Sequence, residues 1–308
     1  MVAGPSSSTW SDIALNTLRL SKDVDSLESL GVDPRDYGVG EYPTVGEYLR
    51  QISLDFNSLL QELRASLLKP IRLAIVFASE TPDPGVLSQI TNSTHYGLLD
   101  AQSLVAVTPE SEIGRWWAHR RGLLTRAIVQ LNAHAFSLTP STAISAIRNC
   151  GPVNHDVLDA AGVRRYGPAH AARDLGRSDL GKFLQGIAID RFETRGTPAE
   201  DATAAYQLLA ERGFNLGEDE NLNHVMADAG RELLERESVA IEEITSEKGL
   251  AFCRLIPDNA FHFSSHITCV EFTWRKGQFL TSGNRSTVAQ YILTKMQKYV
   301  QQLGWATS

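Results

Sequence analysis

The sequence has few cysteines and no long apolar run, and both absences limit what the chain can be. Its only cysteines are Cys150, Cys253 and Cys269. An odd, widely spaced set predicts neither a disulfide framework nor a metal-binding cluster, so we expect buried thiols in a reducing, intracellular compartment. No apolar run reaches the roughly 18 residues that a membrane span needs, so we expect no membrane partner. The Ser-rich start, without a basic segment followed by an apolar one, also predicts no secretory signal.

The common sequence motifs of catalysis are missing as well. There is no P-loop, no GxGxxG after a strand, no GxSxG and no HExxH. We therefore predict that the protein is not an enzyme and uses no cofactor. Two alternatives stay open. His262 and His266 would face the same side of a strand and so suit a metal, although no third ligand is evident. His155, Asp156 and His170 would be the residues of an unrecognised hydrolase.

Charge is distributed in blocks of alternating sign, although the net charge of the whole chain is −7. Residues 112–195 carry 12 basic and 7 acidic groups, a net charge of +5. The net charges of residues 1–111, 196–248 and 249–308 are −7, −9 and +4. A basic block can bind phosphates in a protein that is acidic overall. Alternating blocks can also pair head to tail between identical subunits.

Apolar periodicity predicts a mainly helical fold. Apolar residues recur at helical spacing over residues 44–68, and Pro70 ends that helix. Residues 261–272 are rich in β formers, whereas residues 73–77 fit either a strand or a buried helix. Further helices are expected over about 109–135, from 139, and over 178–192, 197–212, 222–243 and 286–303. We therefore expect a mainly α protein with a flexible N-terminal arm (1–40), a helical core with a basic middle (41–248) and a small α+β region (249–308).

Arginines and tryptophans gather in one segment of the basic block, which reads Arg-Trp-Trp-Ala-His-Arg-Arg from residue 115. Arginine forks bind phosphates, and tryptophan faces stack on bases. The segment therefore predicts RNA-binding roles for Arg115, Arg120, Arg121 and Trp117. The alternative is a core helix with partly buried tryptophans and solvated arginines.

A second stretch, from Arg164 to Asn223, contains an ordered series of motifs. They are Arg165-Tyr166-Gly167, Asp174-Leu175, Asp179-Leu180, Asp190, Thr197-Pro198, the Ala-rich residues 202–209 and Asn215-Leu216-Gly217-Glu218. In order and spacing the stretch resembles part of the core domain of the coat proteins of flexuous filamentous RNA viruses, the potyvirus type in particular. The similarity covers roughly 60 of the 308 residues. It departs from the family at Ile189-Asp190-Arg191, where the family has Phe-Asp-Phe.

This resemblance implies an all-helical core with a groove for single-stranded RNA and terminal arms that dock on neighbouring subunits. The family's groove uses an arginine upstream of the Tyr-Gly turn, held near a helix aspartate. By that correspondence Arg148 would contact phosphate and Asp190 would orient its guanidinium. Four further arginines of the basic block are expected to bind RNA: Arg164, Arg165, Arg173 and Arg177.

The leading interpretation is thus a coat or nucleocapsid protein that binds single-stranded RNA irrespective of sequence. It would self-assemble into helical filaments or rings and would be found in a virion or in the host cytoplasm. The alternative is a non-enzymatic, helical interaction or regulatory subunit of a larger complex with protein or nucleic acid.

Overall fold

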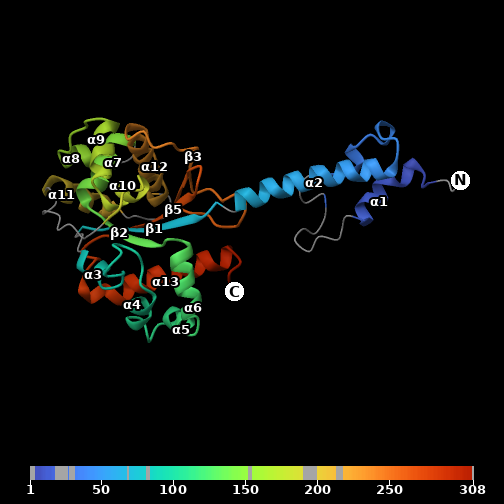
Figure 1. Ribbon diagram of the computed structural model, residues 1–308. Helices are drawn as coiled ribbons and strands as arrows, with labels where there is room; N and C mark the ends of the chain where they lie inside the picture. The colour runs from blue at the N-terminus through green and yellow to red at the C-terminus, as the bar shows by residue number, and fades with distance from the viewer. Residues whose placement is uncertain are drawn as a thin grey trace. The chain divides into compact units, whose positions relative to one another are not determined.

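Two compact units make up the chain, Met1–Lys69 and Pro70–Ser308. The computed structural model describes residues 4–17, 27, 32–67, 69–80, 84–151, 155–189, 200–212 and 218–306 (Figure 1). Among the helices described there, none has the length and apolar character needed to cross a membrane. The sequence predicts boundaries at residues 40 and 248, which fall inside the two units rather than between them.

The N-terminal unit packs two helices around one tyrosine. These are α1 (Trp10–Thr17) and α2 (Val45–Leu67), and α2 confirms the helix predicted for residues 44–68. Tyr48 of α2 is fully buried, and its hydroxyl donates to the Pro34 carbonyl at 2.5 Å. Three rings surround it at centroid distances of 5.5–6.5 Å: Trp10, Tyr37 and Tyr42. Residues on both sides of position 40 therefore share one core.

The second unit is built on a five-stranded mixed sheet with the strand order β2-β1-β5-β4-β3. Its strands are β1 (Ile71–Ala78), β2 (His134–Leu138), β3 (Glu243–Ser246), β4 (Asn259–His262) and β5 (Ile267–Trp274). β1 pairs in parallel with β2 and β5, whereas β4 is antiparallel to both β5 and β3. The three parallel strands end at one edge of the sheet, where Ser79, Thr139 and Arg275 follow them.

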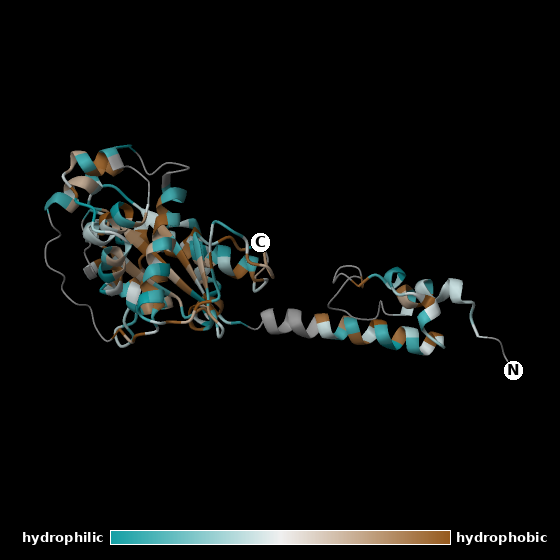
Figure 2. Ribbon diagram, turned by 90° about the horizontal axis from the view of Figure 1, so that it is seen from above, coloured by the Kyte–Doolittle hydropathy of each residue, from teal (hydrophilic) through white to brown (hydrophobic). Residues whose placement is uncertain are grey.

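Helices cover both faces of this sheet, so the unit has three layers (Figure 1). One face carries α7 (Pro140–Cys150), α8 (His155–Ala160), α9 (Pro168–Gly176), α10 (Asp179–Leu184), α11 (Glu200–Arg212) and α12 (Glu218–Arg236). The other carries α3 (Pro84–Ser88), α4 (Ala101–Ala106), α5 (Glu112–Ala118), α6 (Arg121–Gln130) and α13 (Arg285–Gln302). Side chains of β1 alternate between the two cores, as the pleat requires, with Val76 on the first face and Phe77 on the second. Figure 2 shows the apolar strands between these helices.

The mainly helical prediction is therefore corrected to a mixed α/β fold in which helices predominate. β2 occupies residues where the sequence predicted the end of a helix. It is buried on both faces and so lacks the alternating pattern that marks a half-exposed strand. β1 has the same continuous apolar character, which is why residues 73–77 were ambiguous.

The C-terminal residues also differ from the expected appendage. The β-rich stretch 261–272 is split by a turn in which the Phe263 amide donates to the His266 carbonyl at 2.9 Å. β5 then lies in the middle of the sheet, paired along its length with β1. His262 and His266 consequently flank a turn instead of sharing a strand. Across the residues that the structure describes, there is no group of three or more His, Cys, Asp or Glu residues placed to hold a metal ion.

Candidate functional site

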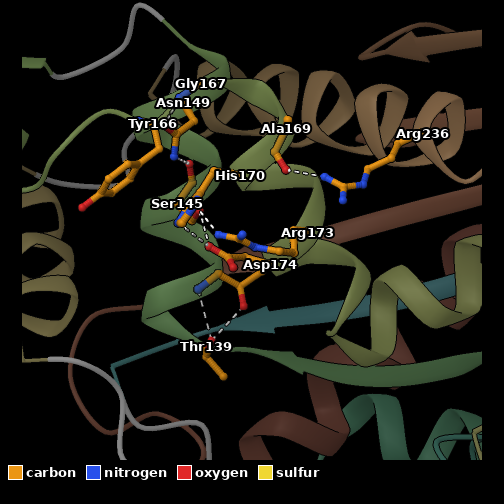
Figure 3. Close-up of polar contacts among 11 residues, drawn as sticks. Thr139, Ser145, Asn149, Tyr166, Gly167, Ala169, His170, Arg173, Asp174 and Arg236 are labelled. Atoms are coloured by element: carbon orange, nitrogen blue, oxygen red, sulfur yellow. Dashed lines mark hydrogen bonds and ion pairs between the residues drawn. The ribbon is translucent and has the colours of Figure 1, made fainter.

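A polar cluster forms where α7 meets α9 (Figure 3). α7 begins directly after β2, because the Thr139 side chain caps it by accepting from the Thr142 amide and Pro140 occupies the first turn. α9 also begins with a proline, Pro168, but its N-cap is Gly167, which has a φ of 92° and no side chain to cap the helix. A left-handed φ of this kind favours glycine, so Gly167 sets the direction in which α9 leaves the turn.

Asn149 fixes this turn to α7. Its side chain is almost fully buried, and its Nδ2 donates to the Ser145 carbonyl one helical turn earlier at 2.8 Å. Its Oδ1 accepts from the backbone amides of Tyr166 and Gly167 at 2.7 and 2.8 Å. One amide side chain therefore orders the backbone on which Tyr166 is carried.

Tyr166 lies outermost in the cluster, 63% exposed, with its ring stacked on His170 at a centroid distance of 4.7 Å. The Arg173 guanidinium lies 2.5 Å from His170 Nδ1, and His170 Nε2 lies 3.2 Å from Asp174 Oδ2. Since a guanidinium only donates, Nδ1 accepts and Nε2 is the nitrogen that donates to Asp174. The Tyr166–His170 pair is thus held in place from α9 itself.

Ser145 joins α7 to the same carboxylate, since its hydroxyl donates to Asp174 Oδ2 at 2.6 Å. This serine is not arranged as a nucleophile, because the histidine contacts Asp174 and Arg173 rather than the serine oxygen. Of the residues of the hydrolase alternative, His170 belongs to this cluster and Asp156 does not. Asp156 pairs with Arg212 at 2.8 Å, and the side chain of His155 lies outside the described residues.

A cavity of about 300 Å3 lies beside this cluster, and Arg164 is the arginine of its lining. Its lining is Ser141, Ile144, Ser145, Asn149, Gly162, Val163, Arg164, Tyr166, His170, Asp174, Asp201 and Ala202. Arg165, Arg173 and Arg177 are exposed on the same segment. We call Arg164, Arg165, Tyr166, His170, Arg173 and Arg177 the α9 surface.

Acidic groups of α12 lie near one end of the α9 surface. Burial raises the pKa of the Cys150 thiol to about 11, and Asp228 and Glu232 act in the same direction while Arg165 opposes them. This thiol therefore stays protonated at neutral pH and is a poor nucleophile. Arg236 of α12 anchors α9 from that side by donating to the Ala169 carbonyl at 3.2 Å (Figure 3).

The resemblance implies that Arg148 pairs with Asp190, but in the structure Arg148 pairs with another aspartate. Arg148 Nη2 lies 2.5 Å from Asp159 Oδ1 of α8, and the arginine side chain is only 12% exposed. Asp190, the expected partner, lies outside the described residues. Because Asp159 belongs to a separate short helix, nothing in the sequence pattern marks it as the partner of Arg148.

The other basic segment lies on the opposite face of the sheet, with α5 and α6 (Figure 1). Arg115, Arg120 and Arg121 are exposed there. Trp117 is fully buried, and its indole N–H donates to the Leu293 carbonyl at 2.9 Å. Its faces are therefore not available to a base, which corrects the role predicted for it. Arg120 lies 4.3 Å over the ring of Trp116. The structure thus separates the arginines named from the sequence into two surfaces instead of one groove.

Sequence reasoning missed Asn149, His170 as a ring partner, and Asp174 as the residue that joins α7 to α9. Tyr166 and His170, and likewise His170 and Asp174, are four residues apart, and this spacing could have indicated that they contact one another along a helix. Comparisons with protein-family models, with curated proteins and with solved structures each found no match for this chain.

Proposed function

We propose that the protein binds single-stranded RNA through the α9 surface, without strong sequence preference. The observation that carries the proposal is the exposed Tyr166 ring, stacked on His170 and bordered by exposed arginines. An aromatic ring of this kind offers a face to any base, and guanidinium groups bind the phosphates on either side of it. Neither contact reads base edges, so sequence tolerance follows from the chemistry.

The buried contacts below this surface support a binding role over a catalytic one. Asn149 and Asp174 hold the backbone turn and the His170 ring before any ligand arrives, which lowers the entropy lost on binding. The mixed α/β fold differs from the all-helical core that the coat-protein resemblance implies. The proposal of RNA binding therefore rests on the α9 surface and not on membership of that family.

The test is fluorescence anisotropy of a labelled oligouridine and a mixed-sequence oligomer at two salt concentrations. The Arg164→Gln/Arg173→Gln variant should bind both oligomers more weakly, and the slope of log affinity against log salt should fall by about 1.4, or roughly 0.7 for each lost phosphate contact. Tyr166→Leu should cost about 1–3 kcal/mol through lost stacking, with the salt slope unchanged.

A matched control removes the same charge elsewhere. Arg254 and Lys276 are exposed and lie outside the α9 surface, so Arg254→Gln/Lys276→Gln should bind RNA nearly as the parent does. Equal losses in both double variants would mean that only net charge matters, and the α9 assignment would then be wrong. A strong preference for one oligomer would exclude the proposed mechanism.

We extend the proposal to a nucleocapsid role, in which copies of the chain assemble along the RNA. The separately folded N-terminal unit and the alternating charge blocks support subunit contacts of this kind. Negative-stain microscopy with RNA should show filaments or rings. Compact monomers that still bind RNA would instead favour the interaction-subunit alternative.

A further inference from the structure

A separate cavity of about 280 Å3 opens beside β5, away from the α9 surface. The pairing of β4 with β5 starts at Asn259 opposite Val270, whereas β5 continues to Trp274 along β1. The last four residues of β5 therefore have no β4 partner, and the cavity lies beside them. This is the carboxyl end of a parallel strand, where open α/β sheets place their ligands.

Eleven residues line this space, which we call the β5 cavity. They come from α12, the loops around β3 and β4, the end of β5 and α13: Asp219, Glu220, Asn223, Glu247, Asp258, Phe272, Thr273, Trp274, Arg275, Tyr291 and Lys295. The volume lies just below the roughly 300–1,000 Å3 of sites for drug-sized ligands, so it suits a small molecule.

The residues that line the β5 cavity include more acidic than basic side chains. Four lining residues are acidic, and two are basic. Lys295 is already held by Glu271, which is fully buried behind the cavity and forms an ion pair with it. Arg275 is exposed and lies over the rings of Phe279 and Tyr291 at 5.3 and 5.9 Å. The remaining excess of negative charge favours a cationic ligand.

The apolar wall of the cavity is rigidly placed. Phe272 and Trp274 are nearly buried, with their rings stacked at a centroid distance of 5.8 Å. The Trp274 indole N–H donates to Asn223 Oδ1, and Asn223 Nδ2 donates to Glu247 Oε1, both at 2.9 Å. Aromatic walls next to carboxylates suit a ligand that combines methylene groups with a positive charge.

Thr273 gives an independent sign of a missing ligand. It lines the cavity and is 4% exposed. Its hydroxyl makes no hydrogen bond of normal length and angle among the described residues, although it lies near enough to the Tyr291 hydroxyl to act against the rise that burial causes in the pKa of that tyrosine. A buried hydroxyl normally has a partner, because leaving one unsatisfied costs free energy. A donor group on a bound ligand would satisfy it.

Asp258 lacks a compensating cation of its own. Its Oδ2 accepts from the Phe272 amide at 2.5 Å. Burial raises the pKa of Asp258 to about 7, Glu271 and Glu247 add to the rise, and Lys295 opposes it. Asp219 and Glu220 of α12 and Arg275 are the other charged residues of the lining. A fraction of this carboxyl group is therefore protonated at neutral pH, and a cation beside it would favour the charged form.

We propose that the β5 cavity binds an aliphatic diamine, with one ammonium group between Asp258 and Thr273 and the methylene chain along Trp274. The second ammonium group would meet the rim carboxylates Asp219 and Glu220. An organic cation is favoured over a metal ion because the described residues include no cluster suited to hold a metal. This inference does not depend on RNA binding, since none of its residues belongs to the α9 surface.

The test is isothermal titration calorimetry of the full chain with 1,4-diaminobutane at about pH 7, in two buffers of different ionisation enthalpy. We expect saturable binding at one site with release of a fraction of a proton, because the cation converts protonated Asp258 to the carboxylate. Affinity should rise between about pH 6 and pH 8 for the same reason. Butylamine, which carries one charge, should bind at least about fivefold more weakly, and Mg2+ should not compete.

Two variants and one control complete the experiment. Asp258→Asn keeps the acceptor for the Phe272 amide, so it should fold, but it should abolish proton release and weaken binding at least about tenfold. Thr273→Val has nearly the same shape and removes only the hydroxyl, so it should weaken binding about fivefold or more in a folded protein. Glu235→Gln, an exposed residue of α12 remote from the lining, should bind as the parent does. The proposal is overturned by absence of saturable binding up to about 10 mM, by unchanged binding in both cavity variants, or by equal competition from Mg2+.

Discussion

The buried ion pair between Lys295 and Glu271 provides a quantitative test of how β5 is held against α13. Glu271 is fully buried and accepts from the Lys295 ammonium group and, at 2.8 Å, from the Tyr299 hydroxyl. Burial lowers the pKa of Lys295, but Glu271, Tyr291 and Asp258 outweigh that effect, so its pKa lies above the usual value. Lys295 is therefore charged at every pH at which the protein is handled.

Lys295→Met leaves the Glu271 carboxylate buried without its cation. Breaking a buried pair in this way costs about 3–5 kcal/mol. Because the Lys295 side chain is 19% exposed and water reaches it, we expect the lower end, about 3 kcal/mol. Glu271→Gln in the same chain removes the uncompensated charge and keeps an acceptor for Tyr299. The Glu271→Gln/Lys295→Met variant should therefore recover at least about half of the loss, since residues of one network are not additive.

Urea unfolding followed by tryptophan fluorescence measures both effects. Four of the five tryptophans lie in the second unit, so the signal reports mainly on the part that contains the pair. Lys298→Met is the matched control, because Lys298 is exposed on the same helix and should change stability by less than about 0.5 kcal/mol. If Lys295→Met cost no more than this control, or if Glu271→Gln made it worse, the buried pair would not hold β5 as described.

Two further predictions concern the cavity and the turn. Asp258 has a folded pKa of about 7 against 3.8 in an unfolded chain, so the stability it confers is fully present below about pH 4 and is lost as pH rises through 7. In the parent, the free energy of unfolding in urea should therefore fall by up to about 4 kcal/mol more between about pH 4 and pH 8 than in Asp258→Asn. The same pH profile in both proteins would refute the assignment. Asn149→Ala leaves the partly buried amides of Tyr166 and Gly167 without their acceptor. It should destabilise the second unit by about 1–3 kcal/mol and weaken RNA binding in a chain that circular dichroism shows to be folded; RNA affinity equal to that of the parent would separate the turn from binding.

The amphipathic helices were predictable because their signal is local. α2 and α13 have apolar residues at helical spacing and clear ends, and the structure places both within about one residue of the predicted bounds. The parallel strands were not predictable, because a strand covered on both faces lacks the alternation of apolar and polar residues that marks a half-exposed strand. β5 could be placed in the middle of the sheet only by its pairing with β1, which lies 196 residues earlier in the chain.

The candidate site was predictable in part. Residue type and their place in the basic block made Arg164, Arg165, Arg173 and Arg177 phosphate-binding candidates, and all four are exposed in the structure. Trp117 also lies in a basic segment, and for that reason was expected to stack on bases. In the structure it packs into the core against α13, and its position in the sequence does not reveal this burial. Asp159 and Asn149 act through contacts between separate helices, and such contacts leave no spacing pattern in a single sequence.

Photocrosslinking tests the central claim most directly, because it reports which residues touch the bases. An oligouridine of about 16 nucleotides, the upper end of known single-strand site sizes, would carry 5-iodouridine and be irradiated with the full chain at low salt. Mass spectrometry should find the crosslinks on Tyr166 or His170, and raising the salt should abolish them. Crosslinks confined to the α5 segment around Trp116, or no crosslink at low salt, would contradict the account.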